Sequence, residues 1–188
     1  MKLHDHKHLE GQHAFLSPSY YHWLRYDDQK LEARYHTVNA ARMGTELHKF
    51  AERAIALGVK LRGSKSSISA FVNDSIDYRM QPEVALFYSI NCFGHADSLG
   101  FRQDLLRIFD LKTGVAKASF QQLEVYAAIF CLEYGISPFD IDIDLRIYQN
   151  GEVHRHQPYS EVILEIMDKI VYFDEKIEAI KIANGDEW

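Results

Sequence analysis

Hydrophobic and polar positions divide the chain into a helical first part, a strand-rich middle and a helical end. Ahead of Pro82, apolar residues recur with the three- and four-residue spacing of amphipathic helices. Ser17 or Ser19 is a suitable N-cap for the first of these helices, and Gly58 is a suitable end for the second. The expected helices cover residues 19–30, 39–57 and 64–76.

After Pro82 the sequence becomes rich in short runs of β-branched and aromatic residues separated by turn residues, Asn150-Gly151 among them. The first three runs predict an antiparallel meander. The expected strands cover residues 84–92, 93–101, 105–112 and 140–148, and the expected helices cover 119–134 and 160–183. This order predicts an α/β fold with a mixed central β-sheet flanked by α-helices, N-terminal helices and a long C-terminal helix.

The closing helix carries an apolar stripe at alternating steps of three and four residues. Its members are Ile163, Ile166, Ile170, Phe173, Ile177 and Ile180. The spacing can form a short coiled-coil seam, which would make the protein a homo-oligomer. Because the repeat is brief, we favour packing of the stripe on the protein's own sheet.

The composition is that of an ordinary globular protein, with 47% hydrophobic and 26% charged residues among 188. We expect one domain, residues 15–188, after a flexible N-terminal segment, residues 1–14. We expect neither a membrane span nor a secretory signal, because no apolar run is long enough and the polar start has no apolar segment. Two cysteines are too few for a disulfide framework, which favours a cytoplasmic, reducing setting.

A net charge of −6 argues against a protein that coats nucleic acid through bulk positive charge. It does not exclude a nuclease, because carboxylates that bind metal ions count as negative in a sequence although the ion neutralises them.

Candidate chemistry begins with Asp110 and Lys112, which alternation places on the same side of a predicted strand. An isolated pair of this kind is usually a surface ion pair. Asp97, late in the preceding strand, can lie beside Asp110, and two carboxylates so close repel each other unless a cation lies between them. Two acids with a lysine are what metal-assisted phosphodiester hydrolysis requires.

Two helical pairs add to this group. Gln122 and Tyr126 are four residues apart and share a helix face, from which an amide and a phenol can hold phosphate oxygens or orient Lys112. His48 and Glu52 have the same spacing, and a neutral imidazole is a good ligand for manganese.

In this order the motifs resemble the RecB-like branch of the PD-(D/E)XK nuclease superfamily. Its G-T-x-x-H, G-x-x-D, D-x-K and Q-x-x-x-Y motifs match Gly44–His48, Gly94–Asp97, Asp110–Lys112 and Gln122–Tyr126. Leu16–Ser19 is similar to the N-terminal signature of that branch, so the resemblance spans residues 16–130.

The resemblance implies a restriction-endonuclease-like core and a metal-dependent deoxyribonuclease, an exonuclease rather than an endonuclease. It implies Mg²⁺ or Mn²⁺ ligands at His48, Asp97, Asp110 and the backbone carbonyl of Leu111, with Lys112 as the catalytic lysine. Gln122 and Tyr126 become accessory catalytic and substrate-binding residues. Helix geometry adds Glu52 as a further metal group, and Thr113 and Lys117 are further substrate-binding candidates.

The resemblance also implies DNA as the partner, in recombination, repair or phage DNA processing within a bacterial cell. A recombinase, a single-strand-binding protein or a helicase is a further expected partner, since the chain has no helicase motif. Some relatives hold an iron–sulfur cluster, but Tyr26-Asp27-Asp28 stands near their first cysteine and the C-terminal cysteines are missing. We therefore expect no iron–sulfur cluster.

Three alternatives stay open. A nuclease-like fold can serve as a catalytically silent DNA-binding or assembly subunit, and the same site chemistry can cleave RNA. An unrelated His-rich zinc protein is a weaker alternative, because the two distant cysteines do not supply closely spaced ligands.

Overall fold

The computed structural model describes residues 14–62, 66–114 and 119–185. Contacts divide the chain into two compact units, Met1–Thr45 and Glu46–Trp188, and the boundary falls within helix α1. The predicted domain of residues 15–188 spans both units. Except for residue 14, the predicted flexible segment 1–14 lies outside the described residues.

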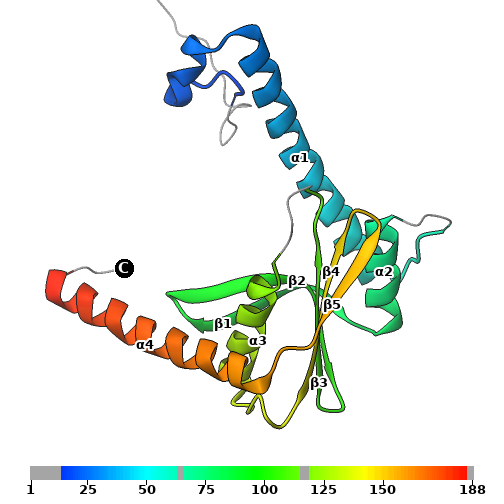
Figure 1. The fold of residues 1–188 in the computed structure, drawn as a ribbon, viewed down its shortest axis with the longest axis vertical. Helices are drawn as coiled ribbons and strands as arrows, with labels where there is room; N and C mark the ends of the chain where they lie inside the picture. The colour runs from blue at the N-terminus through cyan, green and yellow to red at the C-terminus, as the bar shows by residue number, and fades with distance from the viewer. Residues whose placement is uncertain (1–13, 63–65, 115–118, 186–188) are drawn as a thin grey trace, which may run out of the picture. The chain divides into compact units, whose positions relative to one another are not determined.

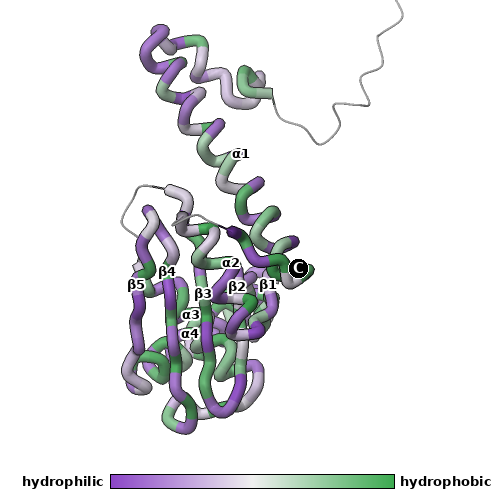
Figure 2. Tube along the Cα trace, turned by 90° about the vertical axis from the view of Figure 1, so that its right-hand side faces the viewer, coloured by the Kyte–Doolittle hydropathy of each residue, from purple (hydrophilic) through white to green (hydrophobic). Residues whose placement is uncertain are grey.

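The first unit contains a short 3-10 helix, η2 (Pro18–Arg25), and the beginning of α1 (Asp28–Ala56). The predicted division into helices 19–30 and 39–57 is therefore wrong. Asp27 caps the N-terminus of α1 by accepting a hydrogen bond from the Lys30 amide at 2.8 Å. The helix continues through the predicted break because residues 28–43 contain neither Gly nor Pro. Figure 2 shows hydrophilic and hydrophobic residues mixed along α1.

The second unit is built on a five-stranded sheet (Figure 1). Its strands, in spatial order, are β1 (Gln81–Ser89), β2 (Cys92–Arg102), β3 (Leu105–Leu111), β4 (Asp142–Gln149) and β5 (Glu152–His156). Neighbouring strands are antiparallel except β3 and β4, which are parallel, so the mixed sheet is confirmed. The sequence prediction missed β5, because Glu152–His156 is short, polar and only partly covered.

Two apolar layers cover the sheet. Helix α3 (Gln121–Tyr134) packs on one face, where its buried residues meet Leu106, Ile108, Leu145 and Ile147. Helix α2 (Ser67–Asp77) packs on the other face together with the C-terminal turns of α1. That second cluster comprises Ala51, Ala54, Ile55, Phe71, Val72, Met80, Phe109, Leu111 and Tyr148. None of the described helices has both the length and the apolar composition to cross a membrane.

The apolar stripe of α4 (Ser160–Asn184) is divided between two environments. Ile163 is fully buried, and Ile166 and Ile170 pack partly buried against the α3 layer. Phe173 and Ile180, further along, are 51% and 57% exposed. The prediction that the whole stripe packs on the sheet is wrong, since its first half contacts mainly α3 and its second half faces outward.

A buried arginine ties α2 to the sheet. Arg146, 4% exposed, donates three hydrogen bonds to the Asp144 carboxylate, of which the Nη2–Oδ2 bond is 2.7 Å. Its guanidinium lies over the ring of Tyr78 and within 3.4 Å of Asp74, which also accepts a 2.8 Å hydrogen bond from Tyr148. Burial acts to lower the pKa of Arg146, but the hydrogen bonds that Arg146 donates to Asp144 and Tyr78 outweigh it and raise that pKa.

Replacing this arginine is expected to destabilise the fold. Arg146→Ala leaves the carboxylates of Asp144 and Asp74 without their buried cation, and such a change costs about 3–5 kcal/mol. Urea unfolding followed by circular dichroism measures the loss. Arg155→Ala, on the exposed face of neighbouring β5, is the matched control and should change the free energy of unfolding by less than about 0.5 kcal/mol. Equal stability of the two variants would contradict this account.

Candidate active site

Three carboxylates lie in one row across neighbouring strands. Pro82 pairs with Ser98 and Val84 pairs with Ala96, so Glu83 of β1 faces Asp97 of β2. On the other side Ser98 pairs with Phe109, and the same register continued by one residue sets Asp97 opposite Asp110 of β3. Directly opposed side chains of adjacent strands are close neighbours, so the row concentrates negative charge at one place on the sheet.

A chain of hydrogen bonds leads from Asp110 to α3. Lys112 donates from Nζ to Asp110 Oδ1 at 3.0 Å and to Gln122 Oε1 at 2.9 Å. Gln122 in turn donates from Nε2 to the Tyr126 hydroxyl at 3.2 Å. The four residues that the D-x-K and Q-x-x-x-Y spacings singled out are thus in continuous contact, and the ammonium of Lys112 is held between two oxygens.

The fold explains why these residues meet. Strand β3 ends at Leu111, and its parallel partner β4 must be reached by a crossover, which α3 supplies. The first turn of α3 therefore returns close to the end of β3 and brings Gln122 to Lys112. Gly94 of β2 lies under Tyr126, where a Cβ atom would be only 2.9 Å from Tyr126 Cε1. A glycine is needed here for the ring to approach the strand.

His48 joins the row from α1. Its Nδ1 lies 3.3 Å from Asp97 Oδ2, and the same carboxylate oxygen accepts a 2.9 Å hydrogen bond from the Leu111 amide. The hydrogen bond from His48 to Asp97 raises the pKa of His48, although its partial burial opposes the shift. A divalent cation bound by Asp97 and His48 would compete with that proton, since a metal-bound imidazole is neutral.

Asp110 is the most buried member of the row, with 4% of its surface exposed. Burial, followed by the charge of Asp97, raises the pKa of Asp110, and Lys112 only partly offsets the shift. Its Oδ2 atom is buried and has no hydrogen-bond partner among the described residues. A buried carboxylate oxygen without a partner is costly, so this atom has the environment of an incomplete coordination site.

The sequence analysis missed Glu83. It is an exposed residue near the start of β1, and its backbone is left-handed, with φ of 48°. Partial burial and the charges of Asp97 and Glu52 raise the pKa of Glu83, while His48 and His95 oppose the shift. Counting back from the β1–β2 turn would have set Val84 opposite Asp97, because the register shift between Phe87 and Ser89 is not visible in the sequence, and the lone position of Glu83 after Pro82 carries no motif.

The donor set fits a hard divalent cation. Ligand atoms of His48, Glu83 and Asp97 lie within 4.8 Å of one another, and the unpartnered oxygen belongs to Asp110, directly across from Asp97. Carboxylate oxygens with one imidazole suit Mg²⁺ or Mn²⁺. Glu52, the predicted additional metal group, is exposed, lies outside this set and affects it through the charge it exerts on Glu83.

The remaining candidates are less defined. Thr113 is exposed immediately after β3, next to Lys112. The side chain of Leu111 is buried in the α2 layer, and a ligand role for its carbonyl oxygen stays a prediction. Lys117 lies outside the described residues.

The architecture defines an α/β protein with a mixed sheet, and comparison with known proteins adds little to this. No family model matches the chain, and no curated protein matches it. Among solved structures, the chain is similar to the crystal structure of SSO0001, with a TM-score of 0.38 and 11% identity over 81% of this chain and 69% of that one. We draw no argument from a likeness this distant.

Removing the charge of Asp110 is expected to have opposite effects without and with metal. Asp110→Asn keeps an acceptor for Lys112 but removes the repulsion with Asp97, so the metal-free protein should melt at a higher temperature than wild type. Wild type should gain about 2.7 kcal/mol when Mn²⁺ is 100-fold above its Kd, and the variant should lose most of this gain.

Thermal unfolding in chelator, Mg²⁺ and Mn²⁺ measures both effects. Asp104→Asn is the control, because Asp104 is an exposed turn residue with φ of 57°, a conformation that asparagine tolerates. If Mn²⁺ stabilises Asp110→Asn as much as wild type, Asp110 does not bind the ion.

Proposed function

We propose that the protein is a metal-dependent nuclease that hydrolyses phosphodiester bonds of DNA. The observation that carries the proposal is the state of Asp110: one oxygen is bound by Lys112, and the other is buried beside Asp97 with no hydrogen-bond partner among the described residues. A structural ion pair would satisfy both oxygens or expose them to water. A buried oxygen left open next to a second carboxylate is instead suited to a cation and a phosphate.

Asp97 and Asp110 would hold the cation, with His48 and Glu83 as further ligands. Bound there, a divalent cation polarises a phosphoryl oxygen and lowers the pKa of a coordinated water molecule. Net hydrolysis adds the hydroxyl of water to phosphorus, breaks one phosphorus–oxygen bond and delivers the proton of water to the departing sugar oxygen.

Lys112 supplies positive charge beside the phosphate. Its ammonium is only one-third exposed, and Asp110 and Gln122 hold it in one orientation, leaving a third N–H for the attacking water or a phosphate oxygen. Fixed donors of this kind stabilise charge that develops in the transition state without reorganising. Gln122 orients Lys112, and the Tyr126 hydroxyl is free to donate to a phosphate oxygen while it accepts from Gln122.

The resemblance to RecB-like nucleases supports DNA as the substrate and attack from an end, in recombination, repair or phage DNA processing. The site chemistry contacts phosphate and is indifferent to the sugar, so RNA is a substrate to test in parallel. A catalytically silent DNA-binding subunit is the outcome to be excluded. It would have no need for a Lys112–Asp110 pair in which the second Asp110 oxygen is buried and has no partner in the described part of the chain.

Loss of Lys112 is expected to abolish cleavage while leaving the fold and the metal site in place. End-labelled linear and closed circular DNA, each single- and double-stranded, is digested with Mg²⁺, Mn²⁺ or chelator. Lys112→Ala should cut at least about 100-fold more slowly than wild type, because a positioned proton donor or charge contributes at least that factor. Lys169→Ala, on exposed α4, should leave the rate unchanged.

Cleavage of linear DNA alone would define an exonuclease, and cleavage of circles an endonuclease. Metal-dependent cleavage of RNA but not DNA would change the substrate. If wild type binds DNA and cuts nothing with either metal, the protein is a binding subunit and the proposed activity is wrong.

A larger residue at position 94, against the Tyr126 ring, tests the proposed roles of Gln122 and Tyr126. In Gly94→Ala the new methyl group would lie 2.9 Å from the Tyr126 ring, so the ring must move and the hydrogen bond to Gln122 must lengthen. We expect the cleavage rate to fall about 10- to 100-fold, since misplacement of about 1 Å has that effect. Gly114→Ala is the control, because a Cβ atom there meets no atom within 4 Å in the described structure. Equal rates for the two variants would remove Tyr126 from the mechanism.

A further inference from the structure

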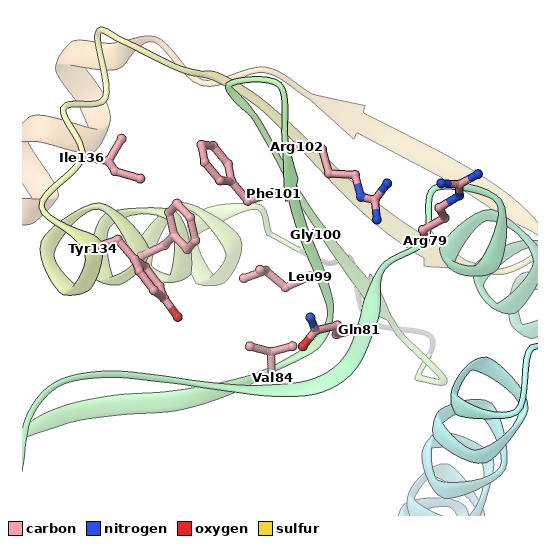
Figure 3. A pocket seen from close by; sticks show the side chains of 10 residues that line it. Arg79, Gln81, Val84, Leu99, Gly100, Phe101, Arg102, Tyr134 and Ile136 are labelled. Atoms are coloured by element: carbon pink, nitrogen blue, oxygen red, sulfur yellow. The ribbon is translucent and has the colours of Figure 1, made fainter.

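A cavity lies at the C-terminal end of β2, where Leu99, Gly100, Phe101 and Arg102 line it (Figure 3). Its volume is about 520 Å³, and it opens where β1 begins. Because Gln81 pairs with Leu99, the last three residues of β2 have no β1 partner, and the sheet has a free edge there. Figure 3 shows Arg79 and Arg102 at one end of the cavity and Phe101, Tyr134 and Ile136 at the other.

The guanidinium groups of Arg79 and Arg102 have no partner among the described residues. In the part of the chain that the structure describes, neither guanidinium takes part in a hydrogen bond or an ion pair. Arg146, by contrast, is fully engaged with Asp144. Arg79 also occupies a left-handed position at the end of α2, with φ of 54°, where glycine or asparagine is usual. Neither the left-handed backbone nor a hydrogen-bond or ion-pair partner among the described residues therefore accounts for an arginine at this position.

The other end of the cavity is aromatic. Phe101 and Phe130 have ring centroids 5.2 Å apart, and Phe130 and Tyr134 have centroids 4.7 Å apart. Tyr134 remains 57% exposed, and its ring is available on the surface of the cavity. Guanidinium groups bind phosphate in a fork geometry, and exposed aromatic rings stack on unpaired bases. The two ends together have the chemistry to bind a nucleotide unit.

The cavity and the candidate active site share the same elements. Asp97 and Phe101 are four residues apart in β2, which is about 13 Å along a strand. Tyr126 and Tyr134 are eight residues apart in α3, about 12 Å along a helix.

From these observations we infer that the cavity is a subsite for single-stranded nucleic acid, in which Arg79 and Arg102 bind a phosphate and Tyr134 stacks on a base at a distance from the scissile bond. The inference rests on the proposed nuclease function for the identity of the strand. It adds a contact that anchors the strand at a distance from the metal ligands and so favours long substrates over short ones.

Binding is measured first, by fluorescence anisotropy of a labelled ten-nucleotide oligodeoxythymidine in chelator, so that no cleavage occurs. The Arg79→Ala/Arg102→Ala double variant should bind about 10- to 100-fold more weakly, as expected for loss of charge-assisted hydrogen bonds. The slope of log K against log salt should fall by about 1.4 for two lost phosphate contacts on a single strand. Arg155→Ala, on exposed β5, is the matched control and should bind as wild type does.

The aromatic contact is tested with Tyr134→Ala. This variant should weaken binding of the oligodeoxythymidine about tenfold but should not affect an abasic oligonucleotide of equal length, since only the former can stack. Wild-type affinity of the double arginine variant, or no oligonucleotide binding by wild type, would overturn the subsite.

Hydrolysis separates this inference from the proposed function. With Mn²⁺, wild type and the double arginine variant should cleave bis(p-nitrophenyl) phosphate equally, because that diester is too short to reach the cavity. On oligonucleotides of two to ten residues, the two proteins should have equal KM for the shortest substrates, and their KM values should diverge once the substrate is long enough to reach the cavity. If wild type binds the oligonucleotide through the arginines but hydrolyses neither substrate, the subsite stands and the nuclease proposal fails. Hydrolysis of both with no effect of the arginines leaves the nuclease and removes the subsite.

Discussion

The burial of Asp110 between β2 and β4, with a lysine on one oxygen and none of the described residues on the other, is the constraint on which the rest of the site depends. A carboxylate in such a place is unfavourable by itself, because it is desolvated and faces the charge of Asp97. The apolar layers around it are what maintain this unfavourable arrangement. Leu106 and Ile108 precede Asp110 on the same face of β3, and the α3 layer covers that face. The Asp110 carboxylate can therefore become hydrated only if the sheet is disrupted.

The parallel pairing of β3 with β4 determines how Gln122 and Tyr126 come to lie beside Lys112. An antiparallel pair could have been closed by a short turn at the end of β3, and Lys112 would then have pointed into solvent. The crossover instead returns α3 over the end of the strand, and Gln122 and Tyr126 come with it. The same helix then continues to Phe130 and Tyr134, so one element links the carboxylate row to the arginine-lined cavity.

Charge is distributed unevenly over the second unit in a way that suits an anionic polymer. The row of Glu83, Asp97 and Asp110 is negative, so under the proposed function a cation must neutralise it before a phosphate can bind there. Arg102 lies five residues beyond Asp97 in β2, about 17 Å along the strand, and Arg79 lines the same cavity. Metal loading and strand binding are therefore expected to be coupled at the site but independent at the cavity.

Local spacing in the sequence determined the features that depend on one element at a time. Alternation along β3 set Asp110 and Lys112 on one side, helical periodicity set Gln122 next to Tyr126, and turn residues located most strands. The features that need two elements far apart in the chain were decided only by the tertiary structure. Glu83 became a neighbour of Asp97 through the register of the β1–β2 hairpin, and Arg79 lines the same cavity as Arg102 because β1 starts too late to cover the end of β2. Helix α1 is continuous where the sequence predicted a break between residues 30 and 39, since residues 28–43 contain no Gly or Pro to end it. Periodicity reports which way a side chain faces on its own element, whereas register and packing decide what it faces, and that information resides in contacts between distant residues.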